Sequence, residues 1–175
     1  PAPTPSPTPV AAPDPATAAP LDWARWLVAN LRPENNAYAT SPSYVTFPSA
    51  DGTVPAEART MCNSFFSALL ARAYGFNENY FRWWTGGRAP TAARWFATAA
   101  AGRQFTRVAR VTDVRPGDVI LVDYGDPTAA STGHIALVDS VPQTRFPQSA
   151  PLVPDTIQYE VDRKSTRRTP VTPIS

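Results

Sequence analysis

Three segments in the first hundred residues place apolar side chains at the spacing of an amphipathic helix. The first begins at Asp22, which can cap a helix, and ends before Pro33; its apolar positions are Trp23, Trp26, Leu27 and Leu31. The second begins near Cys62 and ends near Gly75; its apolar positions are Phe65, Phe66, Leu69, Leu70 and Ala73. The third begins at Thr91 and carries Trp95 and Phe96. These patterns predict three helices, with an aromatic cluster at residues 80–84 between the second and the third.

After Gly102 the pattern changes to that of β-strands. Apolar or alternating runs predict strands at residues 105–111, 119–124, 134–141 and 156–162. The sequence Arg-Pro-Gly-Asp at residues 115–118 predicts a turn before the second of these strands. Helices followed by antiparallel strands predict an α+β domain.

The first twenty residues have a composition unlike that of a folded domain, because eight of them are proline. Proline at this density favours extended polyproline II and cannot build a core. We therefore expect residues 1–20 to be a disordered linker that can be deleted without loss of stability, and residues 21–175 to form one domain. Spacers of this kind commonly separate a domain from an export signal, which predicts an exported protein, periplasmic or extracellular.

The charge balance argues against a nucleic-acid-binding protein. The chain has 16 basic and 14 acidic residues, and its basic run near residues 163–168 is typical of a solvated surface. No apolar stretch approaches the length of about 18 residues that a transmembrane helix needs. A single cysteine excludes an internal disulfide. With one histidine beside it, the chain has too few nitrogen and sulfur ligands for a typical zinc site, so no metal and no organic cofactor is expected.

The one cysteine and the one histidine both have predicted positions that suit a cysteine hydrolase. Cys62 follows a turn-rich loop and opens the second predicted helix, where the helix dipole favours the reactive thiolate. His134 follows Gly133 at the start of a predicted strand, which would hold the imidazole in place to accept the thiol proton. Taken singly, an inert buried cysteine and a structural histidine are the commoner roles. The hydrolase interpretation therefore depends on the pair.

A catalytic imidazole is normally oriented by a third polar group. Glu160 and Asp162 lie on one face of the last predicted strand. We expect this strand to pair with the His134 strand and to bring one of the two carboxylates to the imidazole. Glu160 is favoured because its longer side chain reaches more easily across a strand pair, and a solvent-exposed strand face is the alternative role for both.

These features resemble the NlpC/P60 and CHAP domains, a papain-like group of bacterial cell-wall hydrolases. In that group a cysteine at a helix N-terminus precedes an Arg-Pro-Gly-Asp turn, a hydrophobic strand and a Gly-His-hydrophobic strand. The matching segments here are Cys62, 115–118, 119–122 and 133–138. Tyr44 is similar to the tyrosine upstream of the NlpC/P60 nucleophile. Glu160 and Asp162 are similar to the Glu-x-Asn pattern of CHAP domains, with Asp in place of Asn; the whole resemblance spans residues 40–163.

The resemblance implies a papain-like α+β fold and a cysteine peptidase or amidase. Its substrate would be a peptidoglycan stem peptide or the amide linkage of that peptide to sugar. Cys62 would be the nucleophile and His134 the base, with one of the two carboxylates orienting the imidazole. Backbone N–H groups at the start of the Cys62 helix, with Tyr44 and Asn63 nearby, would stabilise the oxyanion.

Two other functions are compatible with the sequence. The first is a catalytically inactive cell-wall or peptide-binding module of the same fold, in which aromatic side chains line a groove; the candidates are Trp83, Trp84, Trp95 and Phe96. Ordinary core packing is the alternative role of these aromatics. The second function is an exported antibacterial effector hydrolase. Thiol reactivity separates the hydrolases from the binding module.

Overall fold

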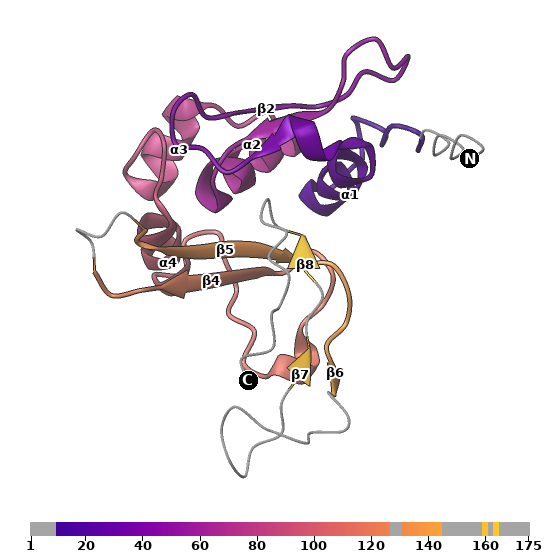
Figure 1. Cartoon of the computed structure of the whole chain (residues 1–175). Helices are drawn as coiled ribbons and strands as arrows, with labels where there is room; N and C mark the ends of the chain where they lie inside the picture. The colour runs from indigo at the N-terminus through magenta and orange to yellow at the C-terminus, as the bar shows by residue number, and fades with distance from the viewer. Residues whose placement is uncertain (1–9, 127–130, 145–158, 161–162, 165–175) are drawn as a thin grey trace, which may run out of the picture.

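The computed structural model describes residues 10–126, 131–144, 159–160 and 163–164 of the chain (Figure 1). Its helices are α1 (Pro20–Asn30), α2 (Cys62–Tyr74), α3 (Glu78–Thr85) and α4 (Ala92–Ala100), with 3₁₀ turns at Pro33–Asn35 and Val111–Asp113. Its strands are β1 (Asn36–Ala37), β2 (Tyr44–Thr46), β3 (Glu57–Arg59), β4 (Val119–Asp123), β5 (Gly133–Val138), β6 (Gln143–Thr144), β7 (Tyr159–Glu160) and β8 (Arg163–Lys164). Helices and small sheets together make a mixed α+β fold, as the sequence predicts.

The first helix begins earlier than its apolar pattern predicts. Pro20 occupies the first turn of α1, where a missing N–H costs nothing. Asp22 therefore lies inside the helix rather than at its cap, and its Oδ2 accepts a hydrogen bond from the Ala19 N–H at 2.9 Å. The Asp22 carboxylate therefore accepts a hydrogen bond from a backbone N–H at the start of the helix, as predicted. The helix itself begins two residues earlier than predicted.

The residues just before α1 contact the domain, although the sequence assigns them to a linker. Ala18 is buried in the hydrophobic core. The Trp26 indole N–H donates to the Val10 carbonyl oxygen at 3.0 Å, which ties the segment along α1. The Ala18 N–H also donates to the Asp14 carbonyl oxygen, closing a turn. The packed part of the domain therefore begins before residue 21, and residues 1–9 lie outside the described part of the chain.

Two truncations are expected to differ in stability for this reason. Deleting residues 1–9 should leave the melting temperature within about a degree. Deleting residues 1–19 removes the Trp26–Val10 hydrogen bond and the buried Ala18. That loss should lower the free energy of unfolding by about 1–2 kcal/mol and the melting temperature by about 3–6 °C. Thermal melts of the full chain and both truncations make the comparison; equal melting temperatures for all three would restore the linker interpretation.

The second predicted helix is confirmed at both ends. α2 begins at Cys62 and ends at Gly75, which adopts a left-handed conformation with φ 70° and donates its N–H to the Ala71 carbonyl oxygen. The aromatic cluster at residues 80–84 forms part of an additional helix, α3, which the sequence analysis did not predict. Asn77 caps α3 by accepting a hydrogen bond from the Tyr80 N–H at 3.0 Å. An Asn cap followed by a Gly terminator was the signal that could have identified it.

The central sheet contains β4, β5 and β8. β4 and β5 are antiparallel, and their register pairs Leu121 with Ile135 and Val122 with His134. This confirms the two predicted strands around residues 119–124 and 134–141. The 115–118 turn is also present, because the Arg115 N–H donates to the Asp118 carboxylate at 2.8 Å. A second small sheet, in the order β1-β3-β2, lies before α2 in the chain.

One predicted strand is wrong, and another has a different partner from the one expected. Residues 105–110 form no strand. The Phe105 ring stacks on Trp84 with centroids 5.3 Å apart, and a 3₁₀ turn follows at Val111–Asp113. The strand predicted at 156–162 is represented by the short β7, which pairs with β6 and not with the His134 strand. On the edge of β5 away from β4, the pairing strand is β8, at Leu137 and Val138.

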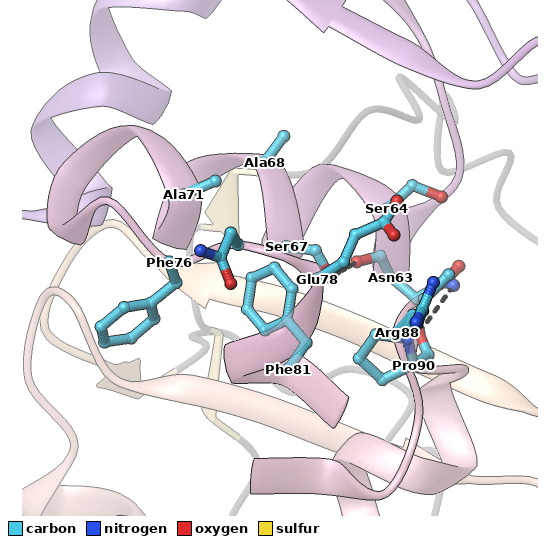
Figure 2. A pocket seen from close by; sticks show the side chains of 12 residues that line it. Asn63, Ser64, Ser67, Ala68, Ala71, Phe76, Glu78, Phe81, Arg88 and Pro90 are labelled. Carbon is cyan, nitrogen blue, oxygen red and sulfur yellow. Dashed lines mark hydrogen bonds between the residues drawn. The ribbon is translucent and has the colours of Figure 1, made fainter. Parts of the chain in front are cut away.

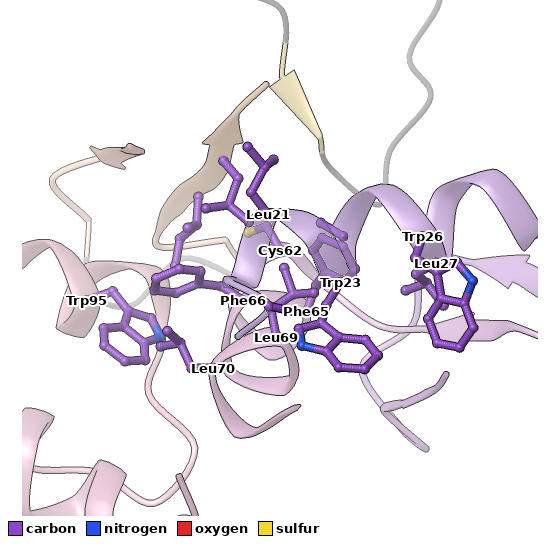
Figure 3. Packing of buried hydrophobic residues seen from close by; sticks show 14 of the residues in the cluster. Leu21, Trp23, Trp26, Leu27, Cys62, Phe65, Phe66, Leu69, Leu70 and Trp95 are labelled. Carbon is purple, nitrogen blue, oxygen red and sulfur yellow. The ribbon is translucent and has the colours of Figure 1, made fainter. Parts of the chain in front are cut away.

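The core lies between α1, α2, α4 and the β4–β5 pair, and Figure 3 shows the side chains that α1 and α2 contribute to it. Trp23 and Trp95 are almost completely buried. Trp95 meets the Phe66 ring of α2 edge-on, with centroids 5.0 Å apart. α2 also packs against β5, since Ile135 and Leu137 belong to the same cluster as Cys62. This confirms that Cys62 opens a helix packed on the sheet.

Candidate functional site

Cys62 is the first residue of α2 and is 6% exposed. Met61 precedes it as the N-cap residue and provides no side-chain hydrogen bond to the helix. The N–H groups of the first helical turn have no acceptor within the helix, so they form a region of positive potential beside the thiol. Within the described residues the thiol donates and accepts no hydrogen bond, and it lies in the hydrophobic cluster (Figure 3).

His134 is the second residue of β5 and is partly exposed. Ile135 and Leu137 on the same strand belong to the cluster that contains Cys62. Because side chains alternate along a strand, His134 lies on the opposite face of β5, with Ala136 and Val138. The imidazole and the thiol are therefore not joined by a hydrogen bond in this structure.

The start of α4 connects the start of α2 to the start of β5. The Asn63 side-chain N–H donates to the Pro90 carbonyl oxygen at 3.0 Å. The Ala93 backbone N–H donates to Oγ1 of Thr132, which directly precedes β5, at 3.3 Å. Gly133 approaches α4 closely, because a Cβ at this position would lie 3.3 Å from the Ala92 Cβ. Residues 90–93, at the start of α4, therefore contact both Asn63, which follows Cys62, and the residues just before His134. The sequence analysis predicted the Thr91 cap of this helix but not this connection.

Gly133 allows a close backbone approach at the start of β5. A Cβ at Gly133 would lie 2.1 Å from the Val122 carbonyl oxygen, which no side chain can tolerate without a backbone shift. The glycine therefore fixes how β5 begins against β4, and with it the position of His134.

Both side chains predicted to help stabilise an oxyanion already have other partners. Tyr44, on β2, donates its hydroxyl hydrogen bond to the Glu57 carboxylate, and this bond raises the pKa of Tyr44, with desolvation and the Glu57 charge adding to it. Asn63 uses its amide N–H for the Pro90 carbonyl oxygen. The structure therefore leaves the backbone N–H groups of the first turn of α2 as the oxyanion donors that are available near Cys62.

The strand that carries Glu160, proposed to orient the imidazole, does not pair with the His134 strand. Glu160 pairs with Gln143 in the β6–β7 ribbon, which Figure 1 shows apart from the β4–β5 pair. Asp162 lies outside the described residues. β8, which pairs with β5 on the edge away from β4, meets it at Leu137, about 10 Å along the strand from His134. The expected strand order was wrong because Tyr159 and Glu160 pair with Thr144 and Gln143 rather than with β5.

The four aromatic residues considered for a binding groove divide between core and surface. Trp84 and Trp95 are buried, and the Trp84 indole N–H donates to the Arg103 carbonyl oxygen at 2.9 Å. Trp83 is 68% exposed and Phe96 is 37% exposed. Core packing therefore explains Trp84 and Trp95, and the four side chains do not line one groove.

Two kinds of feature are absent from the described residues. No group of three or more His, Cys, Asp or Glu side chains there is arranged to hold a metal ion. None of the helices in that part of the chain combines the length and the apolar character needed to cross a bilayer.

Comparison with known proteins gives one similarity. No family model matches the chain, and no solved structure matches it significantly. The chain is similar to an uncharacterized protein of Acanthamoeba polyphaga mimivirus, with 25% identity over 135 residues. The aligned region covers 75% of this chain and 60% of the viral protein, so the chain spans less than two thirds of that relative's length.

Proposed function

We propose that this protein is a cysteine hydrolase of papain-like architecture that cleaves amide bonds, with peptidoglycan stem peptides as its substrate class. The observation that carries the proposal is the arrangement of Cys62 and His134. Cys62 opens a helix that packs against β5, His134 is the second residue of β5, and α4 ties the starts of both elements together. The substrate class comes from the resemblance to NlpC/P60 and CHAP domains.

In the proposed reaction His134 accepts the thiol proton of Cys62, and the thiolate sulfur attacks the amide carbonyl carbon. The resulting oxyanion is stabilised by backbone N–H groups of the first turn of α2. The C–N bond then breaks as the imidazolium returns its proton to the leaving amine. Water attacks the thioester, which releases the carboxylic acid product and restores the thiol.

The positions of Cys62 and His134 add two requirements to this reaction. The imidazole lies on the face of β5 away from the cluster that holds the thiol, so it must turn past the start of β5 toward the sulfur. The thiol lies in a hydrophobic cluster and is 6% exposed, so a rotation about its single side-chain torsion must bring the sulfur out of the cluster before it can react. Catalytic hydrogen bonds are often absent in a free enzyme and form in the substrate complex. Binding of the substrate at the start of α2 would supply the free energy for this rotation.

Alkylation of Cys62 by iodoacetamide tests whether the thiol is activated. If His134 and the helix dipole stabilise the thiolate, the pH at which the alkylation rate is half-maximal should lie below the ordinary cysteine value of about 8.5. Reactivity with iodoacetamide should therefore persist at pH 7. The His134→Ala variant should be alkylated about ten-fold more slowly at pH 7.

The matched control is Val122→Ala, because Val122 pairs with His134 across the sheet and is itself exposed. This variant should keep the wild-type pH profile. Protein unfolded in urea gives the profile of an unperturbed thiol. A wild-type midpoint at or above the unfolded value, unchanged in His134→Ala, would contradict the proposal.

One observation favours a second candidate, a binding module without catalytic activity. Cys62 packs among apolar side chains and makes no hydrogen bond within the described residues, as an inert core cysteine does. In that case the thiol should resist alkylation in the folded protein at every pH up to about 9. The same experiment therefore decides between the two functions.

A further inference from the structure

A cavity lies on the face of α2 opposite the core. Its volume is about 410 Å³, within the range of about 300–1,000 Å³ that small-molecule sites occupy. It is bounded by α2, the start of α3 and the loop before α4 (Figure 2). Cys62 faces the other side of the helix and does not line this cavity, whereas Asn63 and Ser64 of the first turn of α2 do.

One end of the cavity is apolar. Ala71 and Ala68 on α2 face Phe76 and Phe81 across it, and Phe81 is buried. The Phe76 ring is held in place by stacking on Tyr80, with centroids 4.0 Å apart. This end can accept an aliphatic or aromatic side chain.

The other end is polar and lies about two helical turns away, beside Asn63 and Ser64. The hydrogen bond from Asn63 to the Pro90 carbonyl oxygen joins α2 to the loop at this end. Glu78 and Arg88 are drawn toward the same end in Figure 2. The cavity lining therefore includes one acidic and one basic side chain at its polar end.

Neither of these two charged side chains has a partner in the described part of the chain. Glu78 and Arg88 make no ion pair and no side-chain hydrogen bond there, whereas Arg25 and Arg110 both pair with aspartates. A carboxylate and a guanidinium at one end of an apolar cavity present one acceptor group and one donor group to a ligand. They complement an ammonium and a carboxylate held close together on one carbon.

We propose that this cavity binds a free α-amino acid with an apolar side chain. The α-ammonium would donate to Glu78, and the α-carboxylate would accept from Arg88. The side chain would extend between Ala71 and the Phe76 and Phe81 rings. This ligand site goes beyond the proposed hydrolase activity and does not depend on it.

Isothermal titration calorimetry with L-leucine tests the proposal. L-Leucine should bind with a dissociation constant below about 1 mM. N-Acetyl-L-leucine lacks the ammonium, L-leucinamide lacks the carboxylate, and glycine lacks the apolar side chain. Each of these probes should bind at least about ten-fold more weakly, because each removes one of the three contacts.

Variants locate the binding to this cavity. Glu78→Gln and Arg88→Gln should each weaken L-leucine binding by at least about ten-fold. The matched controls are Glu34→Gln and Arg82→Gln, which replace exposed side chains that do not line the cavity and should leave binding unchanged. Melting temperatures of all four variants verify that each is folded.

The variant Cys62→Ala separates this proposal from the hydrolase proposal, since it should bind L-leucine as tightly as wild type does. No binding of L-leucine up to about 10 mM would overturn the amino-acid site. Equal binding of L-leucine and N-acetyl-L-leucine would also overturn it, and would leave an apolar cavity without recognition of the zwitterion.

Discussion

The Cys62→Ala variant is expected to hydrolyse amide bonds in peptidoglycan fragments at least about 1,000-fold more slowly than wild type. The reason is that the alanine side chain has no nucleophile, and loss of the attacking group in a nucleophile–base pair typically removes this much or more. The measurement is the release of new amino groups from purified muropeptides, followed at constant pH. His134→Ala should cause a comparable loss, because the two residues act as a unit.

The control for this prediction concerns stability. Cys62 belongs to the core cluster, so its replacement by alanine is expected to lower the free energy of unfolding by about 1 kcal/mol. A melting curve shows whether the variant is folded at the assay temperature. If folded Cys62→Ala hydrolyses the fragments as fast as wild type, Cys62 is not the nucleophile. If wild type hydrolyses none of them, the binding module replaces the hydrolase.

Trp95→Ala is expected to lower the free energy of unfolding by about 4 kcal/mol. Trp95 is almost completely buried and lies at the meeting point of three elements, with ring centroids 5.0 Å from Phe66 and 5.1 Å from Trp84. Removing a buried indole loses its transfer free energy and leaves a cavity that the neighbouring rings can fill only in part. Urea denaturation followed by circular dichroism measures the change.

Two variants give this prediction its control. Trp83→Ala makes the same substitution at an exposed tryptophan of the neighbouring helix. It should change the free energy of unfolding by less than about 0.5 kcal/mol. Trp95→Phe keeps an aromatic ring and removes an indole N–H that has no hydrogen-bond partner in the described structure, so it should cost only about 1 kcal/mol. A loss for Trp83→Ala as large as that for Trp95→Ala would contradict the assignment of the two tryptophans.

Local sequence patterns were sufficient to predict an element whose structure depends mainly on its own residues. The apolar spacing after Cys62 and the left-handed Gly75 predict α2 correctly, because amphipathic spacing and a glycine terminator act within the helix itself. The β4 and β5 strands follow from two apolar runs separated by a short polar loop. α3 was missed because its aromatic residues were treated as a cluster rather than as a capped helix.

Local sequence patterns could not predict which distant segments pair with each other. The alternation around Glu160 is real in the sequence, but alternation does not specify which strand is the neighbour. β7 pairs with β6, so the carboxylate that was expected beside His134 belongs to a different sheet. Phe105 likewise has the apolar character of a strand residue, yet its ring stacks on Trp84 and the segment forms no strand.

The sequence by itself determined the α+β class, the position of Cys62 at a helix start and the position of His134 at a strand start, because helical and strand periodicities are properties of short segments. Only the tertiary structure decided that the thiol lies in the core cluster, that the imidazole lies on the opposite face of β5, and that Glu78 and Arg88 share one cavity. Each of these depends on which surfaces pack together. Packing joins residues far apart in the chain, and no short-range pattern records it.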